Sequence, residues 1–416
     1  MRGLAPDGGL YMPYSIPKLP KAFFSNLKSM SLKEMAFAVT HSAFSGDIPG
    51  DVLQKLVNNT FSFDMPLRHI AGNHYVMELF HGPTMAFKDV GARFLGGLLR
   101  YYMQQQGGKS VNVLVPTSGD TGAAVAGGLH NVPGVNVWVL YPENSISYIQ
   151  EAQFASLGGN VHALEVKGSF DHCKSLVEQA FKDKDLNQNM LLTSATSINV
   201  ARIVPQVVYY FWAYAQLAHE HESVERLVFS VPCANLGNLV SGLVARELGL
   251  PIDRFVAVEN INHVFYDYMQ TGSFDPQRSV ASIAPALDAG NPTNFERIVD
   301  MTGSIENART LIHARTYDDA AIEATMRDTY DHHSYMLDPH SAFAYRGLCD
   351  DLHAGEIGIS LATAHPAKFA SQVENALGED IDVPRQLSGY LGGMRQVTSI
   401  SHNYNDLRTK LMTFGG

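Results

Sequence analysis

From about residue 75 onward, short runs rich in β-branched residues alternate with segments whose apolar residues recur at helical spacing. The predicted strands cover Val111–Val115, Val135–Tyr141, Val161–Val166, Leu227–Val231, Arg254–Val258 and Ile357–Ala362. The predicted helices cover Thr121–Leu129, Phe170–Lys182, Ile198–His219, Leu239–Leu248 and Ala320–His332. This alternation predicts an α/β fold in which parallel sheets are flanked by helices on both faces.

The start of the chain has a different pattern. A helix is predicted over Ser31–Phe44, with no clear series of strands around it. At roughly 150 residues per domain, a chain of 416 residues is long enough for two or three cooperating lobes. We therefore predict a helical N-terminal subdomain at 1–72, an α/β lobe at 73–200, and a second lobe with the C-terminal region at 201–416.

The composition argues against several kinds of partner. A formal net charge of -11 leaves no basic stripe that could neutralise a phosphate backbone, so nucleic acid is not an expected partner. No apolar stretch has the length of a membrane span or the character of a signal peptide, which makes a cytoplasmic location without membrane contact the expectation. The 3 cysteines are too few for a disulfide framework and are expected to be buried, reduced thiols.

Three loops leave predicted strands and open predicted helices, where free backbone N–H groups and the helix dipole attract anions. They cover residues 116–122 (PTSGDTG), 232–238 (PCANLGN) and 362–366 (ATAHP). The first loop packs glycines and hydroxyl groups into a single turn, as a cradle for an anion would. Ordinary strand-to-helix turns with a capping side chain explain each loop as well when it is considered alone.

A lysine occupies an unusual place in the segment 80–89 (FHGPTMAFKD), because Lys88 follows an apolar pair at the expected first turn of a helix. Shielding from water favours the neutral form of a lysine, and only the neutral amine attacks an aldehyde. The alternative is a lysine whose head group simply reaches solvent.

Competing motifs fail on inspection. The segment 108–110 (GKS) imitates the end of a phosphate-binding loop, but Met103 stands where that motif needs glycine, so a turn is expected. Ser118 lacks the preceding glycine of a hydrolase nucleophile elbow. Asp338 is predicted to cap a helix that runs through Leu348, and no metal site is predicted among the nearby histidines.

Six segments spread over nearly the whole chain carry a family resemblance. They are 4–11 (LAPDGGLY), 81–89 (HGPTMAFKD), 117–124 (TSGDTGAA), 197–202 (SINVAR), 338–342 (DPHSA) and 363–369 (TAHPAKF). Together they resemble threonine synthases of the bacterial and fungal type. The resemblance implies a fold-type-II pyridoxal-phosphate enzyme, similar to the tryptophan synthase β chain. It also implies a carbon–oxygen lyase that converts O-phospho-L-homoserine and water into L-threonine and phosphate.

The resemblance assigns roles to individual residues as well. It implies that Lys88, in the lobe at 73–200, carries pyridoxal 5′-phosphate as a Schiff base and transfers protons. It implies that Thr363 faces the pyridine nitrogen of the cofactor. The cofactor phosphate would lie against the amides of Ala234, Asn235, Leu236 and Gly237, in the lobe at 201–416. The substrate would contact Ser118, Gly119, Asp120 and Thr121, and its phosphate group Ser197, Asn199 and Arg202.

The chain departs from the family pattern in two places. Residues 233–235 read Cys-Ala-Asn where the family usually has Ser-Gly-Asn. If the family glycine has a positive φ, Ala234 would be strained by about 1–2 kcal/mol. The chain also begins at the segment before residue 4, where family members usually have a further stretch, which indicates either a truncated start or a branch without that element.

Two other functions stay open at this point. One is a related phospho-lyase that releases 2-oxobutyrate without adding water, and the other is a homologue that binds the cofactor but does not catalyse. The expected partner in either active form is a small molecule, and the chain is expected to be a monomer or a homodimer.

Overall fold

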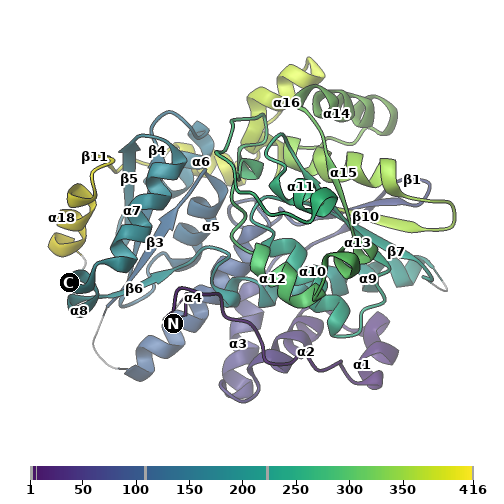
Figure 1. Ribbon diagram of the computed structural model, residues 1–416, viewed down its shortest axis with the longest axis horizontal. Helices are drawn as coiled ribbons and strands as arrows, with labels where there is room; N and C mark the ends of the chain where they lie inside the picture. Colours follow the sequence, from purple (N-terminus) through teal and green to yellow (C-terminus); the bar gives the residue numbers. More distant parts are fainter. Residues whose placement is uncertain (1–2, 6, 107–109, 222–223, 415–416) are drawn as a thin grey trace. The chain divides into compact units, whose positions relative to one another are not determined.

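The computed structural model describes residues 3–5, 7–106, 110–221 and 224–414 (Figure 1). Its contacts divide the chain into two compact units that are discontinuous in sequence. Unit 1 comprises Met1–Tyr11, Lys88–Arg202 and Val383–Gly416, and unit 2 comprises Met12–Phe87 and Ile203–Asp382. The division into 1–72, 73–200 and 201–416 stays a prediction. The predicted turn at 108–110 lies largely outside the described residues.

Unit 1 contains a parallel five-stranded sheet with the order β11-β5-β4-β3-β6. Its strands are β3 (Val111–Pro116), β4 (Val135–Pro142), β5 (Val161–Lys167), β6 (Leu191–Ser194) and β11 (Val397–Ser401). Its helices are α4 (Lys88–Gln106), α5 (Asp120–Leu129), α6 (Tyr148–Ala155), α7 (Phe170–Lys182), α8 (Lys184–Asn189), η2 (Val200–Arg202), α17 (Arg385–Leu391) and α18 (Tyr404–Phe414).

Alternate side chains of this sheet face opposite layers of helices, because successive residues of a strand point to opposite faces. Leu114 and Trp138 pack with Leu176 of α7 and Leu407 of α18 on one face. On the other face α5 packs against β4 so closely that a Cβ on Gly122 would lie 2.8 Å from Val139. Helices on both faces of a parallel sheet are thus confirmed for unit 1.

Unit 2 contains a six-stranded sheet with the order β1-β2-β10-β7-β8-β9, parallel except for the pair β1 and β2. Its strands are β1 (Leu67–Ala71), β2 (His74–Glu78), β7 (Leu227–Pro232), β8 (Arg254–Glu259), β9 (Ile312–Thr316) and β10 (Ile357–Ala362). Its longer helices are α2 (Leu32–Phe44), α3 (Gly50–Thr60), α9 (Val207–Glu220), α10 (Gly237–Glu247), α14 (Asp319–His333) and α15 (Pro339–Asp351). Its shorter ones are α1 (Lys21–Asn26), η1 (Leu27–Ser29), η3 (Val204–Gln206), α11 (Val264–Thr271), η4 (Pro285–Leu287), α12 (Phe295–Thr302), α13 (Ile305–Leu311), η5 (Pro366–Phe369) and α16 (Ala370–Leu377).

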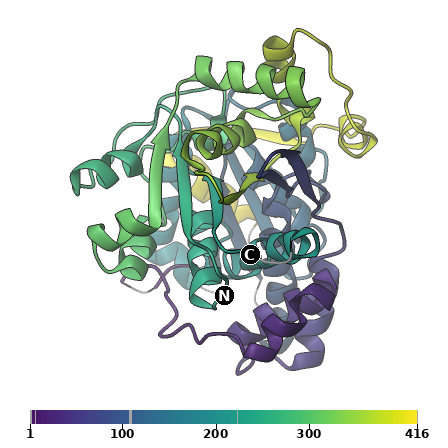
Figure 2. The same cartoon turned by 90° about the vertical axis from the view of Figure 1, so that its right-hand side faces the viewer.

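This second sheet is also covered on both faces. Phe343 and Leu348 of α15 pack with Val228 and Val256 on one face. On the other face, Tyr210 of α9 makes an edge contact with the ring of Phe229 of β7, with centroids 4.8 Å apart. The helices α1, α2 and α3 lie in the N-terminal part of unit 2 (Figure 2), and α2 matches the helix predicted over Ser31–Phe44. Strand β1 nevertheless begins within the predicted subdomain, at Leu67.

All six predicted strands are present, and every predicted helix except the one over Ile198–His219 matches within a few residues. The helix predicted over Ile198–His219 is wrong in its first third, where the chain forms the short turns η2 and η3 before α9 begins at Val207. Pro205 explains the break, because proline lacks the N–H of a helical hydrogen bond and restricts the residue before it.

The cysteines are free, and Cys173 and Cys233 are buried as expected. Cys349 is exposed, contrary to the prediction. It lies near the end of α15, between a helix face that covers the sheet and a face that carries the ion pair of Arg346 with Asp350.

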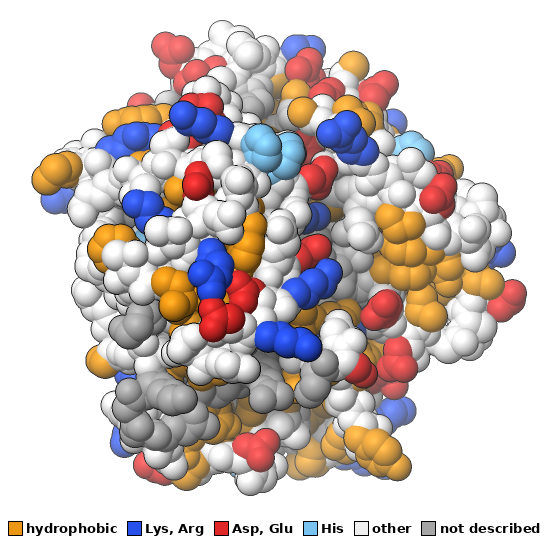
Figure 3. Space-filling model, turned by 60° about the vertical axis from the view of Figure 1, so that its left-hand side comes forward, with side chains coloured by type: hydrophobic (Ala, Val, Ile, Leu, Met, Phe, Trp, Pro, Cys, Tyr) orange, Lys and Arg blue, Asp and Glu red, His pale blue; other side chains and the backbone are white. Residues whose placement is uncertain are grey.

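On the face of the molecule in Figure 3, basic and acidic side chains are interspersed rather than gathered into a basic surface. Among the residues that the structure describes, no helix has the length and apolar character needed to cross a bilayer.

Candidate cofactor and substrate site

Lys88 begins helix α4, and it also begins the segment Lys88–Arg202 of unit 1. The residue before it, Phe87, ends the segment Met12–Phe87 of unit 2. The chain approaching Lys88 is fixed within unit 2 by backbone hydrogen bonds. Phe87 N–H donates to the carbonyl of Thr363 at 2.8 Å, and Ala86 forms a β-bridge with Ala364. The hydroxyl of Tyr209 donates to the carbonyl of Phe87 at 2.5 Å. The backbone that enters Lys88 is therefore anchored to the end of β10, where Thr363 lies.

The turn before this anchor is strained, because Met85 has a left-handed backbone with φ 54°. Such a conformation costs a non-glycine residue about 1–2 kcal/mol and persists only where its surroundings hold it. His365 N–H donates to the carbonyl of Met85 at 3.1 Å. The buried side chain of Lys368 donates to the carbonyl of Thr84 at 2.8 Å. The segment 363–369 thus holds the strained turn on both sides.

The loop expected to receive the cofactor phosphate follows β7. Cys233 N–H donates to the carbonyl of Val258 at 2.7 Å, and α10 begins at Gly237, so the loop presents the first turn of a helix. Ala234 does not have a positive φ, and the strain that we considered for it is absent. Leu236 takes the left-handed conformation instead, with φ 59° and ψ 1°. The unusual backbone lies two residues further along than the sequence pattern indicated.

Asn235 is fixed by residues that the sequence did not single out. Thr293 Oγ donates to its side-chain oxygen at 3.2 Å, and Asn294 Nδ2 donates to its carbonyl at 2.7 Å. Arg297 donates to Asn294 in turn, and burial lowers the pKa of this arginine to about 10. The segment 292–297 (PTNFER) carries no pattern that distinguishes it from a loop and a helix start.

Two further observations test whether this loop suits an anionic phosphate. Asn238, in the first turn of α10, has a buried Nδ2 for which the described residues provide no acceptor, while its Oδ1 accepts from Tyr210 at 3.0 Å. Glu259 ends β8 beside the loop, and burial raises its pKa to about 8, so its neutral form prevails around pH 7. A donor without an acceptor and an uncharged acid are both compatible with a bound phosphate.

Thr363 is supported by the segment 338–342. Its N–H donates to Ser341 Oγ at 3.2 Å, and Ser341 Oγ donates to Asp338, which caps α15 as predicted. His340 Nδ1 lies 2.7 Å from Asp338 Oδ2, and its Nε2 accepts from Ala286 N–H at 3.2 Å. That pattern corresponds to the neutral imidazole with its proton on Nδ1. Asp338 therefore caps α15 and also orients His340 and Ser341.

The loop expected to bind the substrate lies in unit 1, between β3 and α5. Thr117 Oγ accepts from Gly119 N–H at 2.9 Å and from Gly122 N–H at 2.8 Å, which closes the turn. Gly119 has a φ of 128°, a conformation that other residues rarely adopt. Asp120 is buried, whereas Ser118 and Thr121 are partly exposed and can meet a ligand.

The residues expected to bind the substrate phosphate also lie in unit 1, beside the start of α4. Arg202 is buried, and its guanidinium donates to the carbonyls of Ala195 at 2.7 Å and of Lys88 at 3.4 Å. Asn199 Nδ2 donates to the carbonyl of Ser194 at 3.2 Å. Both side chains therefore hold backbone, and Arg202 does so at the lysine itself. Ser197 is partly exposed on the same turn.

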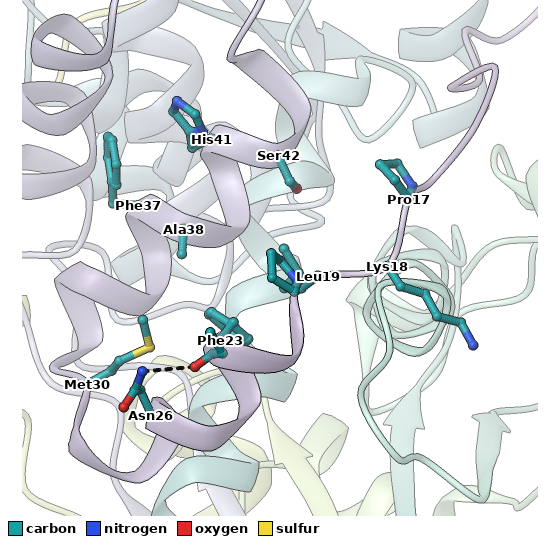
Figure 4. Close-up of a pocket in the computed structure, with 12 residues that line it drawn as sticks. Pro17, Lys18, Leu19, Phe23, Asn26, Met30, Phe37, Ala38, His41 and Ser42 are labelled. Atoms are coloured by element: carbon teal, nitrogen blue, oxygen red, sulfur yellow. Dashed lines mark hydrogen bonds between the residues drawn. The ribbon is translucent and has the colours of Figure 1, made fainter.

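A separate hollow of about 610 Å³ lies in the N-terminal part of unit 2 (Figure 4). Its lining residues are Pro17, Lys18, Leu19, Pro20, Ala22, Phe23, Asn26, Met30, Phe37, Ala38, His41 and Ser42. The side chain of Lys18 points away from the others in Figure 4. None of the predicted site residues lines this hollow. In the described part of the chain, no cluster of His, Cys, Asp and Glu could hold a metal ion.

Comparison with known proteins identifies the class. Residues 65–363 match the family model described as "Pyridoxal-phosphate dependent enzyme". Residues 1–61 match "Threonine synthase N terminus", and residues 342–410 match "Threonine synthase, C-terminal". The chain is therefore a pyridoxal-phosphate-dependent enzyme with the fold-type-II architecture.

Individual relatives narrow the class to a family. Threonine synthase from Escherichia coli is 40% identical over 93% of this chain and 89% of that protein, and the Haemophilus influenzae enzyme is 40% identical over the same shares of 93% and 89%. The crystal structure of the Escherichia coli enzyme superposes with a TM-score of 0.91 over 99% of this chain and 95% of that one, at 35% identity. The pyridoxal-phosphate-bound enzyme from Brucella melitensis gives a TM-score of 0.91 over 99% and 94%, at 30% identity. The chain belongs to the threonine synthase family.

Proposed function

We propose that this chain converts O-phospho-L-homoserine and water into L-threonine and inorganic phosphate. The observation that carries the proposal is the anchoring of Phe87 to Thr363, which fixes the backbone entering Lys88 to the strand end expected at the cofactor ring. Membership of the threonine synthase family supports the choice of reaction. The expectations of a cytoplasmic location and of a monomer or homodimer stay predictions.

The residues divide the work as follows. Lys88 would carry the cofactor, and its amine would be the group that moves the protons at Cα and Cβ of the substrate. The amides of residues 234–237 hold the cofactor phosphate at the first turn of α10. Pyridoxal phosphate supplies, when bound, a ring that accepts electrons from the substrate carbon, and a neutral Thr363 hydroxyl leaves the ring nitrogen largely unprotonated.

The substrate is held by two other groups of residues. Residues 118–121 bind its amino-acid end at the start of α5. Ser197, Asn199 and Arg202 lie on the side of its phosphate, which leaves from Cγ before water adds at Cβ. Because Arg202 also binds the carbonyl of Lys88, it couples the phosphate side to the lysine backbone.

The reaction is tested by incubating the holoenzyme with O-phospho-L-homoserine and measuring phosphate, threonine and 2-oxobutyrate together. Equal amounts of phosphate and threonine are expected. Phosphate with 2-oxobutyrate would identify the phospho-lyase, and the absence of phosphate would identify a silent homologue.

The assignment of Lys88 is tested separately by borohydride reduction of the holoenzyme and peptide mapping. The reduced cofactor should be found on Lys88 alone. The Lys88→Ala variant is the control and should carry no label. Label on the buried Lys368, the other lysine of this region, would refute the assignment.

A further inference from the structure

The carboxylate of Asp120 is buried in the loop that is expected to bind the substrate. Asp120 is the first residue of α5, where the helix dipole and the N–H groups that Thr117 does not already bind attract a carboxylate. A substrate that is an amino acid brings its own carboxylate to the same loop. An Asp120 side chain free to turn toward these donors would compete with the substrate.

The side chain of Gln150, in α6, binds the Asp120 carboxylate. Its Nε2 donates to Asp120 Oδ1 at 2.9 Å, and both side chains are buried. Helix α6 belongs to unit 1 together with the loop, so this contact is internal to one unit.

The orientation of the Gln150 amide is fixed independently by the start of its own helix. Ser147 caps α6 and forms a capping box with Gln150, in which Ser147 N–H donates to Gln150 Oε1 at 3.3 Å. Because the oxygen is engaged with this N–H, the NH₂ group must face Asp120. The sequence signal is the spacing Ser-x-x-Gln at 147–150.

Gly119 brings the two elements close enough for this contact. A Cβ at position 119 would lie 2.5 Å from the side-chain amide of Gln150. The glycine therefore serves both its positive φ and the direct packing of the loop on Gln150. A larger residue at 119 would strain the backbone and push the Gln150 amide out of this contact.

We propose that Gln150 is a positioning residue that holds the Asp120 carboxylate aside, leaving the donors of the loop for the carboxylate of the substrate. The inference rests on the proposed function for its substrate. The contact itself belongs to the folded protein with or without substrate.

The Gln150→Glu variant isolates the contact. Glutamate still accepts from Ser147 N–H, so the helix cap is kept, but the donor to Asp120 becomes a second carboxylate. Two carboxylates at this distance share one proton, so the increase in KM should become smaller as the pH falls. We expect the KM for O-phospho-L-homoserine to rise about tenfold or more at pH 8 and to approach the wild-type value near pH 6, with a smaller change in kcat.

Three further variants complete the test. Gln150→Met keeps the packing volume without hydrogen bonds and should raise the KM equally at both pH values. The double variant Asp120→Asn with Gln150→Glu reverses the hydrogen bond and should remove the pH dependence. Gln179→Glu, on the exposed surface of α7, makes the same charge change elsewhere and should behave as wild type.

The melting temperature of each variant, measured without substrate between pH 6 and pH 8, provides a readout independent of catalysis. The melting temperature of Gln150→Glu should fall more steeply with rising pH than that of wild type, and the double variant should follow the wild-type slope. The proposal is overturned if Gln150→Glu and Gln150→Met keep the wild-type KM, or if both lose activity equally at every pH. A wild-type enzyme that releases no phosphate would refute the proposed function, while the melting curves would still judge the contact.

Discussion

Glu259 is the residue whose protonation the fold changes most clearly. Its Oε2 accepts from Tyr266 N–H at 2.7 Å near the start of α11, and its other oxygen is buried without a partner among the described residues. Burial, and to a lesser degree the nearby Asp267, raises its pKa to about 8. An unfolded glutamate has a pKa of about 4.3, so the folded chain keeps a proton that the unfolded chain loses.

This difference predicts how stability depends on pH. The contribution is fully present below about pH 4.3 and declines by about 1.4 kcal/mol per pH unit until the pH reaches the folded pKa. Gln at position 259 resembles the protonated acid, so Glu259→Gln should match wild type near pH 4.5 and be the more stable protein at pH 8. Urea unfolding at several pH values measures this, and parallel curves for the two proteins would contradict it.

Single residues also show where sequence patterns stop being informative. Lys88 stands out by position and motif, and the loops around Ser118 and Ala234 follow strands, as the alternation of elements indicated. The left-handed backbone falls on Leu236 rather than Ala234, because it is set by how the loop meets α10. Gln150 contacts Asp120 from a separate helix, and no local pattern could predict that pair.

At the scale of elements, the alternation of strands and helices predicted both sheets, because each element carries its own hydrophobic period. The interruption of the helix expected over 198–219 depends on a single proline and on the change of unit after Arg202. Five strands among the described residues were not predicted, namely β1, β2, β6, β9 and β11. Strand β1, for example, is half exposed and pairs antiparallel with β2 at the sheet edge.

The cap of α15 predicts a linked effect on stability and cofactor retention. Ser341→Ala leaves the Thr363 N–H without its acceptor, which should cost about 1–3 kcal/mol. Because Thr363 is also expected at the cofactor ring, the same change should speed dissociation of pyridoxal phosphate, followed by absorbance during dialysis.

A matched control comes from another hydrogen bond to α15, made by a serine of β7. Ser230 donates to the carbonyl of Ala344 of α15 at 2.6 Å, away from Thr363. Ser230→Ala should lower stability by a similar amount while cofactor release stays at the wild-type rate. Equal release rates for wild type and Ser341→Ala would refute the link.

At the scale of the whole molecule, unit 2 contains a buried ion network that joins the ends of three strands to α15. Arg254 donates to Asp351 at 3.0 Å and to Glu356 at 2.8 Å, and His313 and Arg315 also bind Asp351. Hydrogen bonding to Arg254 lowers the pKa of Glu356 to about 2. Burial alone would raise the pKa of Asp351, but its partners hold it well below the ordinary range.

Because both carboxyl pKa values are lowered, the network stabilises the fold above about pH 4 and weakens as the pH falls toward 2. Arg254→Met leaves the buried carboxylates of Asp351 and Glu356 without their shared buried guanidinium and should destabilise unit 2 by about 3–5 kcal/mol. Hydrogen exchange should then rise first in β7, β8, β9 and β10. Arg395→Met removes the half-exposed pairs with Glu151 and Glu165 of unit 1 and should cost less than about 1 kcal/mol. Equal losses in the two variants would contradict the prediction.

The sequence could not predict which distant segments of the chain join to form each unit. Unit 1 takes its edge strand β11 and helix α18 from the C-terminal segment, far along the chain from the strands they join. Hydrophobic period identifies an element but not its partner across two hundred residues of intervening chain.

Because unit 1 is discontinuous in sequence, the two units are completed at different times during synthesis on the ribosome. The last residue that unit 2 needs is Asp382, whereas the sheet of unit 1 waits for β11, which starts at Val397. Unit 2 is therefore complete first, and the sheet of unit 1 keeps an unpaired edge on β5 until β11 has been synthesised. If translation stops before β11, the released chain has a complete unit 2. In unit 1 the free edge of β5 can then pair with another chain and cause aggregation.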